Sequence, residues 1–158
     1  MFLYVICALL FAALVALDQW VKWWVVTNIA YPGGTTLPFI PHILGLSHTR
    51  NTGAAWSILS DHTWILTAVS VLAVLVILYV LVRRKIRHPW GVLSLAVVLA
   101  GAAGNLIDRV RLGYVVDMFQ TLFMNFPVFN VADICVTCGG AAFVIYFVFF
   151  YEKWEKKS

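Results

Sequence analysis

Four long apolar runs constrain this chain more than any other feature. They span residues 2–26, 64–82, 90–108 and 131–151, and a helix of about 20 residues crosses the hydrocarbon core of a bilayer. Of all residues, 63% are hydrophobic and 11% charged, whereas roughly half are apolar in a soluble domain. We therefore expect one membrane domain over residues 1–158, built on four transmembrane helices.

Basic residues predict how these helices are oriented. They concentrate in the short loop 83–89 and in the tail after the last run, at Arg83, Arg84, Lys85, Arg87, Lys153, Lys156 and Lys157. Cytoplasmic loops carry an excess of Lys and Arg, so this loop and both termini are expected in the cytoplasm. The loops 28–61 and 110–130 then lie outside. We interpret the net charge of +4 as a topology signal and expect no nucleic-acid partner.

The two outer loops differ from the membrane runs. Pro and Gly mark turns in the first loop, and residues 35–40 and 43–50 alternate loosely, as short strands do. We expect a small extracytoplasmic antiparallel β-sheet there. Apolar residues in the second loop favour a short amphipathic helix lying on the membrane: Met118, Phe119, Leu122, Phe123 and Phe126. The expected fold class is thus an all-α integral membrane protein with a small sheet and a short interfacial helix.

Polar residues gather between the third and fourth apolar runs. Three Asp, two Asn and an Arg lie there: Asn105, Asp108, Arg109, Asp117, Asn130 and Asp133. Ionisable groups near bilayer depth are costly to keep and therefore indicate a functional site. Asp117 and Asp133, the aspartate pair, have no adjacent basic residue. Two carboxylates that face each other at low dielectric share one proton, which suits hydrolysis in which one activates water and the other polarises a carbonyl.

Other charged residues are expected to support the site. Asp18 and Lys22 are four residues apart, so they share a helix face and can pair. Asp108 is next to Arg109 in the chain, points elsewhere on a helix, and can reach back to Lys22. We expect Asp18, Lys22 and Asp108 to form structural support.

The Asn residues near these carboxylates have two interpretations. Asn105 shares a helix face with Arg109, Asn130 precedes Asp133 by three residues, and Asn51 precedes small residues. Each Asn can satisfy backbone groups at a turn or a helix end. We favour substrate contacts for Asn105 and Asn130, while turn and ligand contact are equally compatible with Asn51.

Other hydrolytic chemistries fit poorly. Ser70 and Ser94 lie within apolar runs with no His at a matching depth, which argues against a Ser–His–Asp triad. The sequence contains no H-E-x-x-H motif, so it predicts no zinc site, and we expect neither metal nor cofactor. Cys7, Cys135 and Cys138 all lie in apolar runs and are interpreted as small buried apolar residues.

Spacing alone leaves three functions open. The first is a membrane protease that uses the aspartate pair. The second is a small proton-coupled carrier with Asp108, Asp117 and Asp133 as a relay, although these carboxylates lie on one side of the membrane rather than across it. The third is a structural membrane subunit.

Five motifs in order resemble those of the lipoprotein signal peptidases, the bacterial type II signal peptidase family. They cover almost the whole chain: Asp18-Gln19-x-x-Lys22, Asn51-Thr52-Gly53-Ala54-Ala55-Trp56, Gly104-Asn105-Leu106-Ile107-Asp108-Arg109, Val115-Val116-Asp117 and Phe129-Asn130-Val131-Ala132-Asp133. The family's usual Phe after the first catalytic Asp is replaced by Met118, which is also apolar.

The resemblance implies an aspartic endopeptidase of the bacterial cytoplasmic membrane, blocked by globomycin. Its substrates would be prolipoproteins that carry a diacylglyceryl group on the lipobox Cys, cut on the amino side of that Cys at the outer leaflet. Membrane lipids would surround the enzyme, which we expect to be a monomer. Asp117 and Asp133 match the catalytic pair, and five residues match the substrate site: Asn51, Gly53, Asn105, Arg109 and Asn130.

Overall fold

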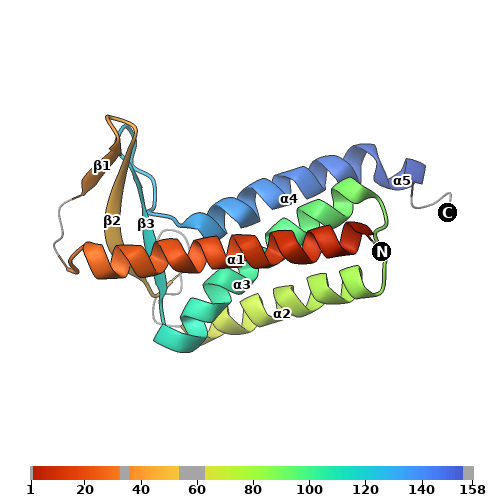
Figure 1. The fold of residues 1–158 in the computed structure, drawn as a ribbon, viewed down its shortest axis with the longest axis horizontal. Coiled ribbons are helices and arrows are strands. Elements are labelled where there is room, and N and C mark those ends of the chain that lie inside the picture. Colours follow the sequence, from red (N-terminus) through yellow and green to blue (C-terminus); the bar gives the residue numbers. More distant parts are fainter. Residues whose placement is uncertain (1, 33–35, 54–62, 155–158) are drawn as a thin grey trace.

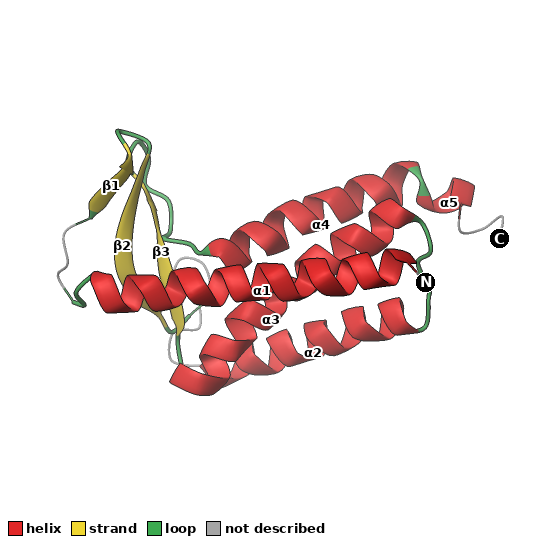
Figure 2. Ribbon diagram, in the orientation of Figure 1, coloured by secondary structure: helices red, strands yellow, loops and turns green. Residues whose placement is uncertain are grey.

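A bundle of long helices carries a small β-sheet at one end (Figures 1 and 2). The computed structural model describes residues 2–32, 36–53 and 63–154. Residues 1, 33–35, 54–62 and 155–158 lie outside this part of the chain. They include the end of the predicted motif at residues 54–56 and the last four residues of the tail. The sheet and the N-terminal end of the first helix lie at opposite ends of the bundle (Figure 1).

Four of the described helices are long and apolar enough to cross a membrane. They are α1 (Phe2–Asn28), α2 (Thr63–Val82), α3 (Pro89–Leu112) and α4 (Val131–Phe149). A short helix, α5 (Tyr151–Trp154), follows α4.

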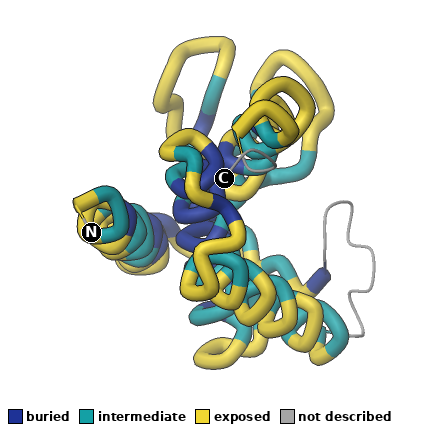
Figure 3. Tube along the Cα trace, turned by 90° about the vertical axis from the view of Figure 1, so that its right-hand side faces the viewer, coloured by how far each residue is buried: buried dark blue, intermediate teal, exposed yellow. Residues whose placement is uncertain are grey.

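The α3 helix is the centre of the bundle. Half of the residues in its most apolar 18-residue stretch are buried, whereas the most apolar stretch of α2 has no buried residue. Burial is concentrated where the helices meet, and the outward sides of the helices are exposed (Figure 3). This distribution suits a bilayer, because lipid solvates apolar side chains that water would not.

The ends of α3 follow from local chemistry. His88 caps the first turn by accepting a hydrogen bond at Nδ1 from the Trp90 N–H (3.2 Å), and Pro89 occupies the first turn, where its missing N–H costs nothing. Gly113 ends the helix in the left-handed conformation (φ 79°) and donates its N–H to the Arg109 carbonyl (3.1 Å). The helix therefore extends past residue 108, where we expected the span to end.

Three glycines allow α3 to approach α1 and α4 closely. A Cβ at Gly104 would lie 2.6 Å from the Asp18 carboxylate, and one at Gly139 would lie 3.0 Å from the Val98 backbone nitrogen. A Cβ at Gly101 would collide with the Ala132 carbonyl oxygen. The backbone of α3 therefore brings its polar residues against both neighbouring helices.

The sheet has three antiparallel strands in the order β1 (Leu37–Ile40), β2 (Leu44–Asn51) and β3 (Val115–Thr121). In the β2–β3 register, Thr49 pairs with Asp117 and Asn51 with Val115. Alternate residues point to opposite faces of a strand. One face packs on the end of α1 through a buried apolar cluster, and the other carries Asp117: the cluster is Val25, Ile29, Val116 and Met118.

The prediction of a short interfacial helix in residues 110–130 was wrong. Residues 115–121 form β3, and no helix is described between that strand and α4. The apolar residues Val116 and Met118 are buried against α1 at strand spacing, and β2 supplies the hydrogen-bonding partner. The periodicity of a short apolar run cannot distinguish these structures, because the partner strand is remote in the sequence.

Candidate active site

A cavity lies between the sheet and the membrane helices, and it is called the polar cavity because the candidate polar residues are on its wall. Its volume is about 620 Å³, and β2, α2, α3, β3, α4 and the segment 126–129 contribute to its wall. Its polar lining residues are Asn51, Ser70, Asn105, Arg109, Asp117, Asp133 and Thr137. Both members of the predicted aspartate pair therefore open into the same cavity, together with most of the predicted substrate residues.

Asp117 enters this cavity from β3. It is 1% exposed, and each of its carboxylate oxygens accepts one hydrogen bond from an amide. Asn130 Nδ2 donates to Oδ1 (2.7 Å), and Asn51 Nδ2 donates to Oδ2 (2.9 Å). The Asn51 amide is held in turn, because its Oδ1 accepts from the Gly53 N–H (2.9 Å).

Burial raises the pKa of the Asp117 carboxyl to about 7. Loss of water around the charged form is the largest cause, and the nearby Asp133 charge raises the pKa further. The hydrogen bonds from Asn51 and Asn130, and the more distant Lys22 charge, lower it. A carboxyl with this pKa is available as a proton donor near neutral pH.

Asp133 is part of the N-terminal cap of α4. Its Oδ2 accepts from the Asn130 backbone N–H (3.1 Å), while Asn130 Oδ1 accepts from the Asp133 N–H (2.9 Å), which is a reciprocal capping box. Its other oxygen, Oδ1, accepts from Asn105 Nδ2 (2.8 Å). The positive end of the helix dipole favours a negative charge at this position.

Asn130 connects the two carboxylates. It is fully buried, and its Nδ2 donates to Asp117 and also to Asn105 Oδ1 (3.0 Å). We expected a substrate contact at this residue, but its side chain lies behind the cavity wall and is occupied within the protein. The interpretation of Asn130 as a helix cap is therefore confirmed, and its side chain also contacts Asp117.

Arg109 extends the positive side of the cavity. Its Nη1 donates to Ser70 Oγ on α2 (3.4 Å), and within the described parts of the chain it forms no ion pair, in contrast to Lys22. The guanidinium therefore keeps donors for a carbonyl or another acceptor that enters the cavity. Sequence reasoning assigned no such role to Ser70, because a single Ser in an apolar run has no distinguishing pattern.

Behind the cavity lies a buried triad formed by Asp18, Lys22 and Asp108. Lys22 Nζ is 2.9 Å from Asp18 Oδ2 and 3.1 Å from Asp108 Oδ2, so both predicted pairings are present. All three side chains are almost completely buried. Gln19, to which no role was assigned from the sequence, donates through Nε2 to Asp18 Oδ2 (3.2 Å) and Asp108 Oδ1 (3.1 Å).

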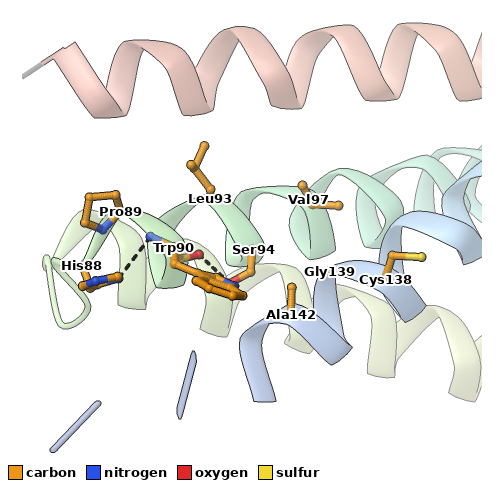
Figure 4. Close-up of a pocket in the computed structure, with 9 residues that line it drawn as sticks. All are labelled: His88, Pro89, Trp90, Leu93, Ser94, Val97, Cys138, Gly139 and Ala142. Carbon is orange, nitrogen blue, oxygen red and sulfur yellow. Dashed lines mark hydrogen bonds between the residues drawn. The ribbon is translucent and has the colours of Figure 1, made fainter. Parts of the chain in front are cut away.

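A second cavity of about 650 Å³ lies between α3 and α4 toward the end of the bundle remote from the sheet (Figure 4). Cys138 lines both cavities. The polar atoms here are already engaged, since Ser94 Oγ donates to the Trp90 carbonyl (2.9 Å) and His88 Nδ1 accepts from the Trp90 N–H. The lining of this cavity is almost entirely apolar, so it presents mainly surface for packing.

Known proteins are similar to this chain in sequence and in fold. The family model described as Signal peptidase (SPase) II, Peptidase_A8, matches residues 10–149. The lipoprotein signal peptidase of Enterococcus faecalis is 49% identical over 92% of this chain and 89% of its own length. That of Latilactobacillus sakei is 46% identical over 88% of this chain and 89% of its own.

A solved structure described as a bacterial membrane enzyme superposes with a TM-score of 0.82. It is 30% identical in sequence and matches over 95% of this chain and 90% of that one. Together with the four apolar helices, these matches mean that the protein spans the membrane several times. The chain belongs to the signal peptidase II family and is a membrane protease of lipoprotein processing.

Proposed function

We propose that the protein removes signal peptides from diacylglyceryl-modified prolipoproteins by aspartic protease chemistry. Cleavage falls on the amino side of the lipobox Cys, and a water molecule is the nucleophile. The observation that carries this proposal is the common cavity of Asp117 and Asp133. Asn130 joins their carboxylates, because its side chain donates to Asp117 and its backbone N–H donates to Asp133.

The environments of the two carboxylates suggest different roles. Asp117, with its pKa raised to about 7, holds the shared proton at neutral pH and polarises the scissile carbonyl. Asp133, at the N-terminus of α4, is ionised and draws a proton from the attacking water. Protonation of the leaving nitrogen then completes hydrolysis without a covalent intermediate.

Residues of the cavity wall can position the substrate. Arg109 has free donors for a peptide carbonyl, and Asn51, Gly53 and Asn105 lie beside the aspartate pair. We assign Asn130 to the support of the pair, because it is fully buried. Asp18, Lys22 and Asp108 support the site from behind.

The remaining wall suits a lipid-anchored substrate. Apolar side chains from α2, α4 and the segment 126–129 border the cavity, among them Val69, Phe126, Val128 and Ile134. Acyl chains can pack there while the lipobox reaches the carboxylates, which converts a dilute encounter into an effectively unimolecular one. We place this site at the outer leaflet of the cytoplasmic membrane, with both termini in the cytoplasm, and the enzyme acts as a monomer among membrane lipids.

The test is cleavage of one purified diacylated precursor by the purified protein, with and without globomycin. We expect release of the signal peptide by the wild type, inhibition by globomycin, and loss of release in both Asp117→Asn and Asp133→Asn. Glu152→Gln, which removes a carboxylate in α5 at the other end of the bundle, is the control and should retain activity.

Retained cleavage in either aspartate variant would exclude the mechanism. Flux measurements on the same variants in liposomes distinguish the protease from a proton-coupled carrier. A carrier would move protons together with a solute and would release no peptide.

A further inference from the structure

The side-chain amides of Asn51, Asn105 and Asn130 are all oriented in the same way around the aspartate pair. Each donates through Nδ2 to a carboxylate oxygen, and each has its own oxygen occupied by a fixed donor. For Asn51 that donor is the Gly53 N–H, and for Asn130 it is the Asp133 N–H, both at 2.9 Å. The backbone therefore sets the orientation of these two amides.

Asn105 is oriented by a side chain instead. Its Oδ1 accepts from Lys22 Nζ (3.0 Å) as well as from Asn130 Nδ2 (3.0 Å). An ammonium group can only donate hydrogen bonds, so the oxygen of this amide must face Lys22. Its Nδ2 consequently faces Asp133 Oδ1 (2.8 Å). A flipped amide would place its NH₂ group against two donors and its oxygen against the Asp133 carboxylate.

The ammonium group of Lys22 is itself fixed in position. It is 3% exposed, and its three donors are each used, by Asp18 Oδ2, Asp108 Oδ2 and Asn105 Oδ1. It does not line the polar cavity. Lys22 therefore has contacts only with these three neighbours among the groups described, and beyond them only its charge reaches Asp117.

The two carboxylates of the buried triad hold the backbone beside the aspartate pair. Asp18 Oδ1 accepts from the Ala132 N–H (2.9 Å), one residue before Asp133. Asp108 Oδ2 accepts from the Val116 N–H (3.0 Å), one residue before Asp117. One ammonium group thus joins contacts to both elements that carry the pair.

We infer that Lys22 is a positioning residue for hydrolysis: through Asn105 it commits a hydrogen-bond donor to Asp133 and so keeps that carboxylate aimed into the cavity. This inference rests on the proposed aspartic mechanism and adds a role beyond structural support. The other charged groups near the pair are Arg109 and Asp108 on α3 and Asp18 on α1. None of these contacts the oxygen of Asn105.

The decisive variant is the combination Lys22→Met, Asp18→Asn and Asp108→Asn. It removes the cation with both of its partners, so no unpaired charge stays buried, and the new amide oxygens can still accept from Ala132 and Val116. The contact that orients Asn105 is lost together with the two ion pairs of Lys22.

We expect kcat to fall by about tenfold or more, because Asp133 has lost the fixed donor that aims it at the attacking water. KM should change by less than about threefold, because substrate contacts remain.

Gln19→Met is the matched control within the same buried cluster. It removes two hydrogen bonds from the triad and leaves the contact between Lys22 and Asn105. We expect a lower unfolding temperature with little change in kcat. An equal fall of kcat in this control, or an unchanged kcat in a folded triple variant, would show that Lys22 is only structural.

Asn105→Asp decides the question if the triple variant does not fold. Lys22 would hold one oxygen of the new carboxyl group, and the other would oppose Asp133. We expect cleavage to be lost at neutral pH and partly recovered in acid, where the new carboxyl group is protonated and can donate. Loss of activity at every pH would overturn the inference.

Infrared difference spectra provide a measurement without substrate. The carboxylate stretching bands of the pair, which respond to hydrogen bonding, should shift in the triple variant and stay in place in Gln19→Met. If the wild type cleaves no precursor, the proposed function fails, whereas these bands still report whether Lys22 governs the hydrogen bond to Asp133.

Discussion

At the scale of single residues, each oxygen of Asp117 and Asp133 meets one donor, and every donor found in the described chain is an uncharged amide. Hydrogen bonds from amides hold a carboxylate in place but favour its ionised form less than a contacting cation does. The basic side chains lie one step away, with Lys22 behind Asn105 and Arg109 on the cavity wall. This arrangement orients the pair while leaving a proton on it near neutral pH.

The pH dependence of cleavage follows from the pKa of Asp117. At a pH below this pKa of about 7, the carboxyl group holds the proton that polarises the carbonyl. At a higher pH the proton is lost. We expect kcat/KM, which reports the free enzyme, to fall as the pH rises through about 7.

A single substitution tests the cause of that alkaline limb. Asn51→Leu removes a hydrogen bond that lowers the pKa of Asp117, so the limb should move to higher pH even if KM also rises. Unfolding temperatures measured at each pH separate titration from denaturation. An alkaline limb at the same pH in both proteins would contradict the assignment of the proton to Asp117.

At the scale of elements, close packing of α3 places the polar residues. Asn105, Asp108 and Arg109 are on the same helix, yet they contact α4, α1 and α2 respectively. Three helices can converge on one turn of α3 only where their backbones approach closely, as they do at Gly101, Gly104 and Gly139. Small residues commonly form such contacts between membrane helices.

Two alanine substitutions measure the importance of this packing. In Gly101→Ala the new methyl group collides with the Ala132 carbonyl and contacts the Val136 side chain, so we expect destabilisation by about 1–3 kcal/mol and weaker cleavage. Gly140→Ala is the control, because a Cβ there meets nothing within 4 Å. Unfolding in detergent measures both. Equal stability of the two variants would mean that α3 and α4 can separate without cost.

At the scale of the whole molecule, charge and fold divide the protein into two ends. The sheet occupies one end, while the N-terminal end of α1, the basic loop between α2 and α3, and α5 occupy the other (Figure 1). The polar cavity adjoins the sheet, since β2 and β3 contribute to its wall. The excess of Lys and Arg at the second end favours a cytoplasmic location for it. The aspartate pair is then near the outer surface, where exported precursors arrive.

Thiol labelling of intact cells tests this orientation. In a variant without native cysteines, Phe123→Cys at the sheet end, where the side chain is 66% exposed, should react with a membrane-impermeant maleimide. Lys85→Cys, in the basic loop, should react only after the membrane is permeabilised. The reverse pattern would place the active site in the cytoplasm and exclude the proposed substrate.

Local sequence was sufficient for the membrane helices, since each long apolar run satisfies its backbone hydrogen bonds internally and needs no partner to be recognised. It also identified Asp117 and Asp133 as candidates, because unpaired carboxylates beside apolar runs are rare. The tertiary structure alone decided that residues 115–121 form a strand, because β2, which pairs with them, is remote in the chain. It likewise decided that Asn130 lies between the carboxylates and that Lys22 faces Asn105. Those contacts depend on how closely α1, α3 and α4 pack, and residue spacing within one helix carries no information about that distance.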